Sequence, residues 1–223
     1  MTEIERELAW AEWAYAFVSL LGSAVPIVEP LELLAAETAS PELQQASRQM
    51  LDGILTGHTL LTAAREWPEP LPGLGLAYLR VGEVAGILDE TPLAWAEALR
   101  GRVEQRFRYG PAAVTPELER QRAENTLLRL LGMCLSSGVP LDVAWEAIGL
   151  VFTGWPERAA QLQDALHAAG TEEVAPVLEA LGASPLACRI ARHGGTFGHL
   201  DRSLLRAADL LDYQLALRLL PAS

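Results

Sequence analysis

Apolar residues recur along this chain at the spacing of α-helices. One continuous apolar face is formed by Trp13, Phe17, Leu20, Leu21 and Ala24, at i, i+4, i+7, i+8 and i+11. A second face with the same spacing is formed by Leu127, Leu131, Cys134, Leu135 and Gly138. No segment alternates apolar and polar residues for long enough to predict a strand. The pattern therefore predicts an all-α fold.

Several helix starts are marked by a hydroxyl residue before a proline, because the hydroxyl caps a free amide and proline suits the first helical position. These pairs are Ser40-Pro41, Thr115-Pro116 and Ser184-Pro185. Thr171, followed by two glutamates, is expected to begin a helix in the same way. Expected helix ends are Gly53, Gly57, Gly170 and Gly182. The predicted helices are 4–22, 27–38, 41–55, 59–66, 73–84, 88–108, 116–137, 141–152, 156–169, 172–181, 185–193 and 200–219.

Two motifs occur twice. Ser-Ala-Val-Pro-Ile-Val at 23–28 is followed 114 residues later by Ser-Gly-Val-Pro-Leu-Asp at 137–142. Val-Gly-Glu-Val-Ala-Gly-Ile-Leu-Asp at 81–89 is echoed 112 residues later by His-Gly-Gly-Thr-Phe-Gly-His-Leu-Asp at 193–201. The matching offsets predict two tandem six-helix bundles related by internal duplication, 1–110 and 111–223. The repeated positions expected to shape the backbone are Pro26, Gly82, Gly86, Pro140, Gly194 and Gly198.

The joint between the predicted bundles, 109–114, is too short for a flexible tether. We therefore expect the two bundles to pack on each other as an internal pseudo-dimer, with a homodimer as the alternative.

The charge balance restricts the partners. The 17 basic residues are all arginine and face 29 acidic ones, which gives a net charge of −12. Phosphate would be repelled, so nucleic acid and anionic lipid surfaces are disfavoured as partners. With no lysine in the chain, phosphate-loop and Schiff-base chemistry are excluded as well.

The sequence predicts a cytoplasmic protein. Two cysteines in helical contexts do not make a disulfide framework, and the charged start of the chain is unlike a secretory signal. The uncharged run 13–28 is shorter than the roughly 20 residues that a span needs, and Gly22-Ser23 and Pro26 interrupt it. We therefore expect no direct membrane insertion, although the chain could lie at the inner membrane through its partners.

The repeated motifs resemble those of the type II secretion F-protein family, the platform proteins of type II secretion and type IV pilus machines. The segment 20–34, Leu-Leu-Gly-Ser-Ala-Val-Pro-Ile-Val-Glu-Pro-Leu-Glu-Leu-Leu, is similar to the family's opening motif. The segment 82–89, Gly-Glu-Val-Ala-Gly-Ile-Leu-Asp, resembles its Gly-Glu-x-x-Gly-x-Leu-Asp/Glu signature. The resemblance implies two six-helix bundles and a non-enzymatic scaffold that relays work from an assembly ATPase to pilin subunits.

The chain also departs from that family. Family members carry transmembrane helices after each domain, whereas here a charged segment, 115–120, follows the first repeat. Glu83 of the signature is replaced by Gly195 in the second copy. These departures support an alternative function, that of a soluble helical regulatory or interaction module that has diverged from secretion.

The candidate partner-binding residues are Glu83, Asp89 and Glu90, within the signature or next to it. The alternative is structural: Glu83 would cap nearby amides, the glycines would permit a tight turn and Asp89 would open the next helix. A wider acidic set, which also includes Glu29, Glu32 and Glu97, could either be solvated or attract a basic partner.

No catalytic, cofactor or metal site is predicted. Cys188, His193, His199 and Asp201 lack the spacing of a zinc site, and a buried thiol with two turn histidines explains them better. The glycines at 194–198 follow a helix, where a phosphate loop would follow a strand, so we interpret them as a turn. An enzyme would need acid–base residues clustered in one pocket, and the sequence has no motif of that kind.

Overall fold

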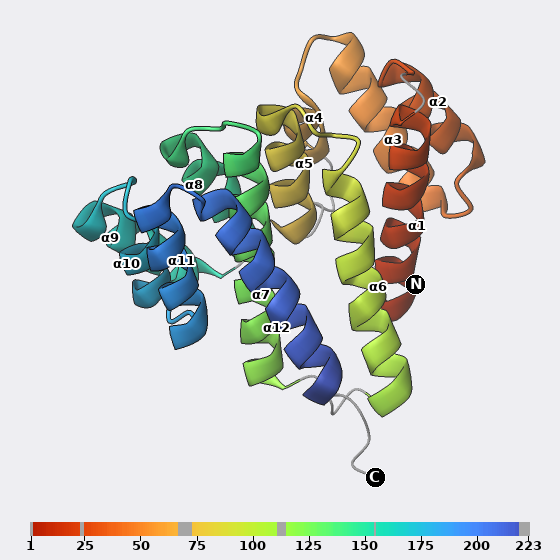
Figure 1. The fold of residues 1–223 in the computed structure, drawn as a ribbon. Helices are drawn as coiled ribbons and strands as arrows, with labels where there is room; N and C mark the ends of the chain where they lie inside the picture. The colour runs from red at the N-terminus through yellow and green to blue at the C-terminus, as the bar shows by residue number, and fades with distance from the viewer. Residues whose placement is uncertain (1, 23–24, 67–72, 111–114, 154, 219–223) are drawn as a thin grey trace. The chain divides into compact units, whose positions relative to one another are not determined.

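The computed structural model describes residues 2–22, 25–66, 73–110, 115–153 and 155–218. Its described residues form helices and the turns that join them, without a strand. The chain divides into two compact units, Met1–Pro111 and Ala112–Ser223. Each unit contains six of the α-helices shown in Figure 1 and is described by itself.

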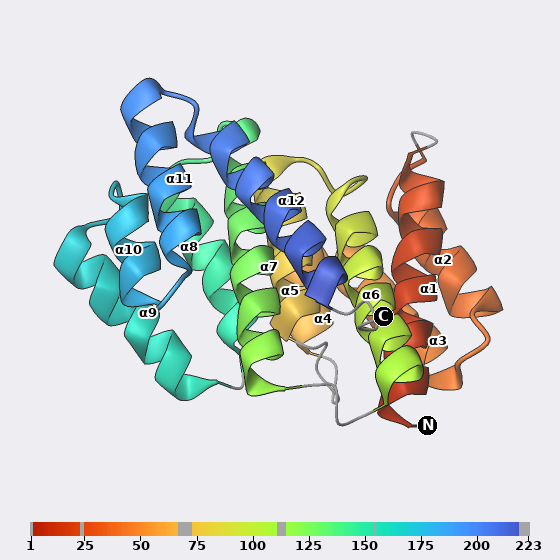
Figure 2. The same cartoon turned by 60° about the horizontal axis from the view of Figure 1, so that its bottom comes forward.

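The helices of the first unit are α1 (Glu3–Leu21), α2 (Val28–Glu37), α3 (Pro41–Leu55), α4 (Leu60–Arg65), α5 (Gly73–Ala85) and α6 (Thr91–Tyr109). The long helices α1 and α6 pack along each other, and α2 packs on α3, as both views show (Figures 1 and 2). Helices α4 and α5 connect these two pairs, because α4 contacts α3 and α5 contacts α6.

Tryptophans fill the core of the first unit. Trp13 is 1% exposed, stacks on Phe17 with 5.0 Å between ring centroids, and donates from Nε1 to Ser47 Oγ at 2.8 Å. Trp10 lies 5.6 Å from the Trp95 ring. Burying such large apolar side chains is the main driving force for packing these helices together.

A cluster of charges ties α1 to α6 beside this core. Arg106 Nη1 lies 2.9 Å from Glu7 Oε2, and Arg106 Nη2 lies 3.1 Å from Glu3 Oε1. Arg102 Nε is 3.3 Å from the other Glu7 oxygen. Because Glu7 is buried, it needs these cationic partners to offset its desolvation.

The second unit consists of α7 (Pro116–Ser136), α8 (Leu141–Gly149), a 3₁₀ turn η2 (Leu150–Phe152), α9 (Pro156–Ala169), α10 (Val174–Ala180), α11 (Pro185–Phe197) and α12 (Leu200–Arg218). Here α7 packs along α12, α9 contacts α10, and α11 lies between α10 and α12 (Figures 1 and 2). Most neighbouring pairs of the first unit therefore have a counterpart in the second, but the α2–α3 pair does not, because α8 and α9 each contact η2 instead. The origin of the two units by duplication stays a prediction.

The described part of the chain confirms the all-helical prediction and three of the caps. Ser40, Thr115 and Ser184 each accept a hydrogen bond from the amide three residues later, and a proline stands at the start of each helix. None of the helices in the described ranges combines the length and the apolar character that crossing a membrane requires.

Several predicted helix ends were wrong. Thr171 does not cap a helix: α10 begins at Val174, and the Thr171 carbonyl instead accepts a bond from Trp145 Nε1 at 3.0 Å. The helix predicted over 141–152 changes to a 3₁₀ turn after Gly149.

Glycines account for the other differences. Gly53 lies inside α3 and does not end it. Its missing side chain lets α4 approach, since an added Cβ would lie 3.2 Å from Ala63 Cα. The helix predicted over 185–193 continues to Phe197, since two adjacent glycines at 194–195 do not break α11.

Candidate functional site

The signature 82–89 forms the end of α5 and the turn before α6. Gly82 and Glu83 belong to the last turn of α5, in agreement with the helix predicted over 73–84. Ile87 N donates to Gly82 O at 2.9 Å, and Gly86 has a φ of +70°, a left-handed conformation that favours glycine. The backbone therefore reverses here within a few residues.

Gly82 also lets two helices approach closely. An added Cβ would meet Thr91 Oγ1 at the start of α6 and would lie 3.2 Å from Leu88 Cα. The second unit contains the same arrangement, where a Cβ on Gly194 would lie 2.6 Å from Ser203 Cβ and 3.0 Å from Leu200 Cα. Both helical turns thus require glycine for the same steric reason.

The two remaining backbone-shaping pairs also correspond. Gly198, like Gly86, has a φ of +70°, and His199 N donates to Gly194 O at 2.9 Å. Pro26 and Pro140 stand before α2 and α8, where their carbonyls accept bonds from Glu29 N at 3.0 Å and Ala144 N at 2.9 Å.

Glu83 binds the beginning of another helix. Its Oε1 accepts from Leu60 N at 2.5 Å and its Oε2 from Leu61 N at 3.4 Å. These amides belong to the first turn of α4, where Thr59 Oγ1 also accepts from Thr62 N at 3.1 Å. The carboxylate therefore satisfies amides that the helix itself leaves without acceptors, and its charge suits the positive helix end.

Burial raises the pKa of the Glu83 carboxyl above its ordinary value, and the hydrogen bonds from the Leu60 and Leu61 amides oppose part of that rise. The balance arises because a half-buried carboxylate loses hydration that two amides only partly replace. Glu83 is thus engaged inside the unit.

Asp89 and Glu90 are exposed, in the turn that leads into α6. Neither side chain makes a hydrogen bond or ion pair within the described residues. The predicted opening of α6 by an Asp89 side-chain cap is not seen, because Glu90 occupies the cap position and makes no such bond. The structure therefore separates the three candidates into one internal carboxylate and two that face solvent.

The second unit lacks the counterpart of the Glu83 contact. Gly195 is exposed and has no carboxylate to offer, and Glu173, the residue just before α10, makes no side-chain hydrogen bond to the start of that helix. The replacement seen in the sequence thus coincides with an uncapped helix start.

The alternative metal cluster does not assemble in the described part of the chain. No group of three potential ligands comes together there. His193 lies within α11 and stacks on Phe197 with 6.3 Å between centroids, while Cys188 is buried and its Sγ lies 3.8 Å from Ala183 O.

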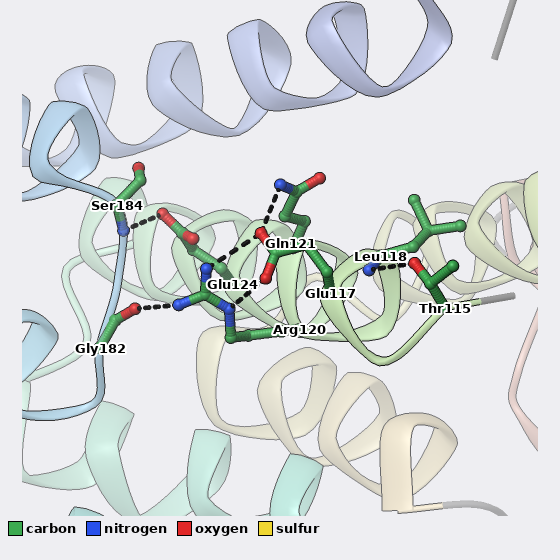
Figure 3. Close-up of polar contacts among 8 residues, drawn as sticks. All are labelled: Thr115, Glu117, Leu118, Arg120, Gln121, Glu124, Gly182 and Ser184. Atoms are coloured by element: carbon green, nitrogen blue, oxygen red, sulfur yellow. Dashed lines mark hydrogen bonds and ion pairs between the residues drawn. The ribbon is translucent and has the colours of Figure 1, made fainter. Parts of the chain in front are cut away.

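A polar cluster that sequence reasoning missed lies between α7 and the turn after α10 (Figure 3). Arg120 Nη1 donates to Gly182 O at 3.1 Å, and Glu124 Oε1 accepts from Ser184 N at 2.8 Å. Arg120 is held in turn by Glu117, whose two oxygens lie 3.0 and 3.1 Å from Nη2 and Nε. The cluster fixes α7 against the α10–α11 turn.

Next to this cluster is a pocket of about 40 Å³. Its walls come from α7, η2, α9 and the end of α10, and Arg158 of α9 reaches the Leu181 carbonyl with its Nη1 at 2.8 Å. Trp155 lines it and is 46% exposed. The residues come from segments distant in sequence, so spacing alone gave no signal.

Together, these features define a helical protein whose signature shapes a helix–turn–helix crossing and leaves two carboxylates facing solvent. Residues 13–109 match the family model of "Type II secretion system (T2SS), protein F". The chain is also similar to the type II secretion system protein F of Pseudomonas aeruginosa, with 31% identity over 98 residues. That match covers 44% of this chain and 24% of the relative, so it spans about a quarter of the relative's length. The first unit is thus similar to the T2SS protein F family over most of its length, and the second unit lies outside the family-model match.

Proposed function

We propose that this chain is a non-enzymatic scaffold or adaptor, similar to the cytoplasmic part of a type II secretion or type IV pilus platform protein. Its first partner would be the assembly ATPase of such a machine, and its place would be cytoplasmic, at the inner membrane through that partner. The observation that carries the proposal is the family match of residues 13–109, which includes an intact signature at 82–89.

The geometry of the signature suggests how it would work. Glu83 holds α4 against the end of α5 and so acts as a positioning residue. Asp89 and Glu90 follow on the exposed turn, where they would contact a basic patch on the ATPase. Exposed acidic residues elsewhere in the unit would steer the encounter; they are Glu29, Glu32 and Glu97.

The test is direct binding of the purified full chain to the assembly ATPase encoded in the same genome, measured by biolayer interferometry at several salt concentrations. Asp89→Asn with Glu90→Gln should weaken binding about tenfold or more, chiefly at low salt, since exposed charges are screened by ions. The matched control is Glu12→Gln with Asp52→Asn, which removes the same charge from exposed positions on α1 and α3.

Equal effects of the two double variants would mean that net charge, and not the turn before α6, determines binding. If the ATPase does not bind at all, the adaptor proposal is wrong. The alternative function, an interaction module that has diverged from secretion, then becomes the better interpretation. It agrees with the second copy of the signature, in which Gly195 stands where the first copy has Glu83.

A further inference from the structure

The pocket of the second unit combines an apolar interior with two arginines, Arg120 and Arg158, and one carboxylate, Glu124, which accepts a hydrogen bond from Ser184 N. Leu127, Phe152 and Leu178 are buried and line it, while Trp155 stands partly exposed. Its volume of about 40 Å³ is roughly three times the space that a single water requires, which suits one aliphatic side chain. All of its lining residues belong to the second unit.

The 114-residue repeat offset aligns two pocket-lining positions of α7 with two tryptophans of the first unit. At positions 114 residues earlier than Glu124 and Leu127 stand Trp10 and Trp13, which are 4% and 1% exposed. Glu124 and Leu127 are smaller than tryptophan, and both line the pocket. Unfilled apolar space costs stability, so its presence calls for an occupant that fills it.

The arginines of the pocket differ in how fully they are engaged. Arg120 is paired with Glu117. Arg158 uses only Nη1, which donates to Leu181 O at 2.8 Å and to Gln161 Oε1 at 3.1 Å. Within the described residues its Nε and Nη2 have no acceptor, and no carboxylate lies within ion-pairing distance of it. In a chain of net charge −12, this arginine is a specific place for an external carboxylate.

We propose that this pocket binds the C-terminal residue of a partner protein, with the terminal carboxylate on Arg158 and the last, aliphatic side chain in the apolar interior. A C-terminal residue carries its carboxylate and its side chain on the same Cα, at a fixed short separation. This matches a pocket that holds one side chain and lies beside one available guanidinium. A strongly acidic segment fits less well, because the net charge of −12 would repel it. The proposal concerns the second unit and is independent of ATPase binding by the first.

The test uses the full chain and fluorescein-labelled peptides of the form Gly-Ser-Gly-Ser-Xaa, where Xaa is valine, leucine or phenylalanine. Fluorescence polarisation compares each free acid with its C-terminal amide. We expect saturable binding of the free-acid peptide that ends in leucine or valine. The corresponding C-terminal amide should bind about tenfold or more weakly, because it loses a charge-assisted hydrogen bond.

Arg158→Gln should weaken binding of the free-acid peptide about tenfold and leave the affinity of the amide peptide unchanged, because only the free acid uses the guanidinium. The matched control is Arg202→Gln, an exposed arginine on α12 that does not line the pocket. A second variant, Leu127→Phe, should fill the pocket and abolish binding while circular dichroism shows an unchanged helix content.

Three results would overturn the proposal: equal affinity of acid and amide, equal effects of Arg158→Gln and Arg202→Gln, or no saturable binding by any peptide. If isocaproate, a free acid with the same apolar group, binds as tightly as the leucine peptide, the ligand is a small molecule and the assignment to a protein C-terminus is wrong.

Discussion

The contact of Glu83 with α4 can be tested by Glu83→Ala. The substitution leaves the amides of Leu60 and Leu61 without their acceptor, while Thr59 continues to cap Thr62. Of the two bonds only the one to Leu60 is short, so we count one charge-assisted bond, about 1.5–3 kcal/mol when fully buried. Because Glu83 is half-buried, we expect the lower part of this range, about 1.5–2 kcal/mol.

The measurement is urea unfolding of wild type and variant, together with hydrogen exchange of the amides at 60 and 61. The expected loss corresponds to a decrease in the melting temperature of the first unit by roughly 6–16 °C. Glu83→Gln is the matched control, since it keeps an acceptor oxygen and should lose about 0.5–1 kcal/mol. The capping role would be refuted if Glu83→Ala left the hydrogen-exchange rates of the amides at 60 and 61 unchanged and lowered the free energy of unfolding by less than about 0.5 kcal/mol.

The pH dependence has a definite sign. The pKa of Glu83 is raised by burial from its ordinary value of 4.5, so the folded chain binds this proton more tightly than the unfolded chain does. The associated stabilisation is complete below pH 4.5 and is lost as the pH rises through the folded-state pKa. The stability difference between wild type and Glu83→Ala should therefore be larger at pH 4 than at neutral pH. A difference that grows toward neutral pH would contradict this balance of burial and hydrogen bonding.

Three further predictions concern the second unit. Gly195→Glu should restore the missing contact at the start of α10 and stabilise the unit by about 0.3–1 kcal/mol more than Gly195→Ala, as measured by urea unfolding; equal stability would show that no cap forms. Gly194→Ala should destabilise by about 1–3 kcal/mol, because its Cβ would lie 2.6 Å from Ser203 Cβ, whereas Gly195→Ala, with open space, should not. Burial raises the pKa of Cys134 to about 12 and raises that of Cys188, so disulfide exchange with Ellman's reagent at pH 7 should be slow and follow unfolding in urea. Fast labelling of both thiols in the folded chain would contradict their burial.

Local features of the chain were predictable because their causes lie within a few residues. Ser40 and Ser184 cap helices through the amide three positions on, and Gly86 and Gly198 adopt positive φ, which glycine accepts most easily. The prediction at Gly53 failed because a glycine inside a helix can serve a packing role: the missing side chain leaves room for Ala63 of the next helix, which the local sequence does not reveal.

The candidate site shows the same division. The sequence by itself indicated the signature, the acidic pair Asp89 and Glu90, and the replacement of Glu83 by Gly195 in the second copy, because these are matters of residue type and spacing. Only the tertiary structure decided that Glu83 binds amides 22 and 23 residues earlier in the chain. It also brought Arg158 and Leu127 to one pocket, since a pocket depends on how much volume the side chains of separate helices leave unfilled, and no local pattern encodes that sum.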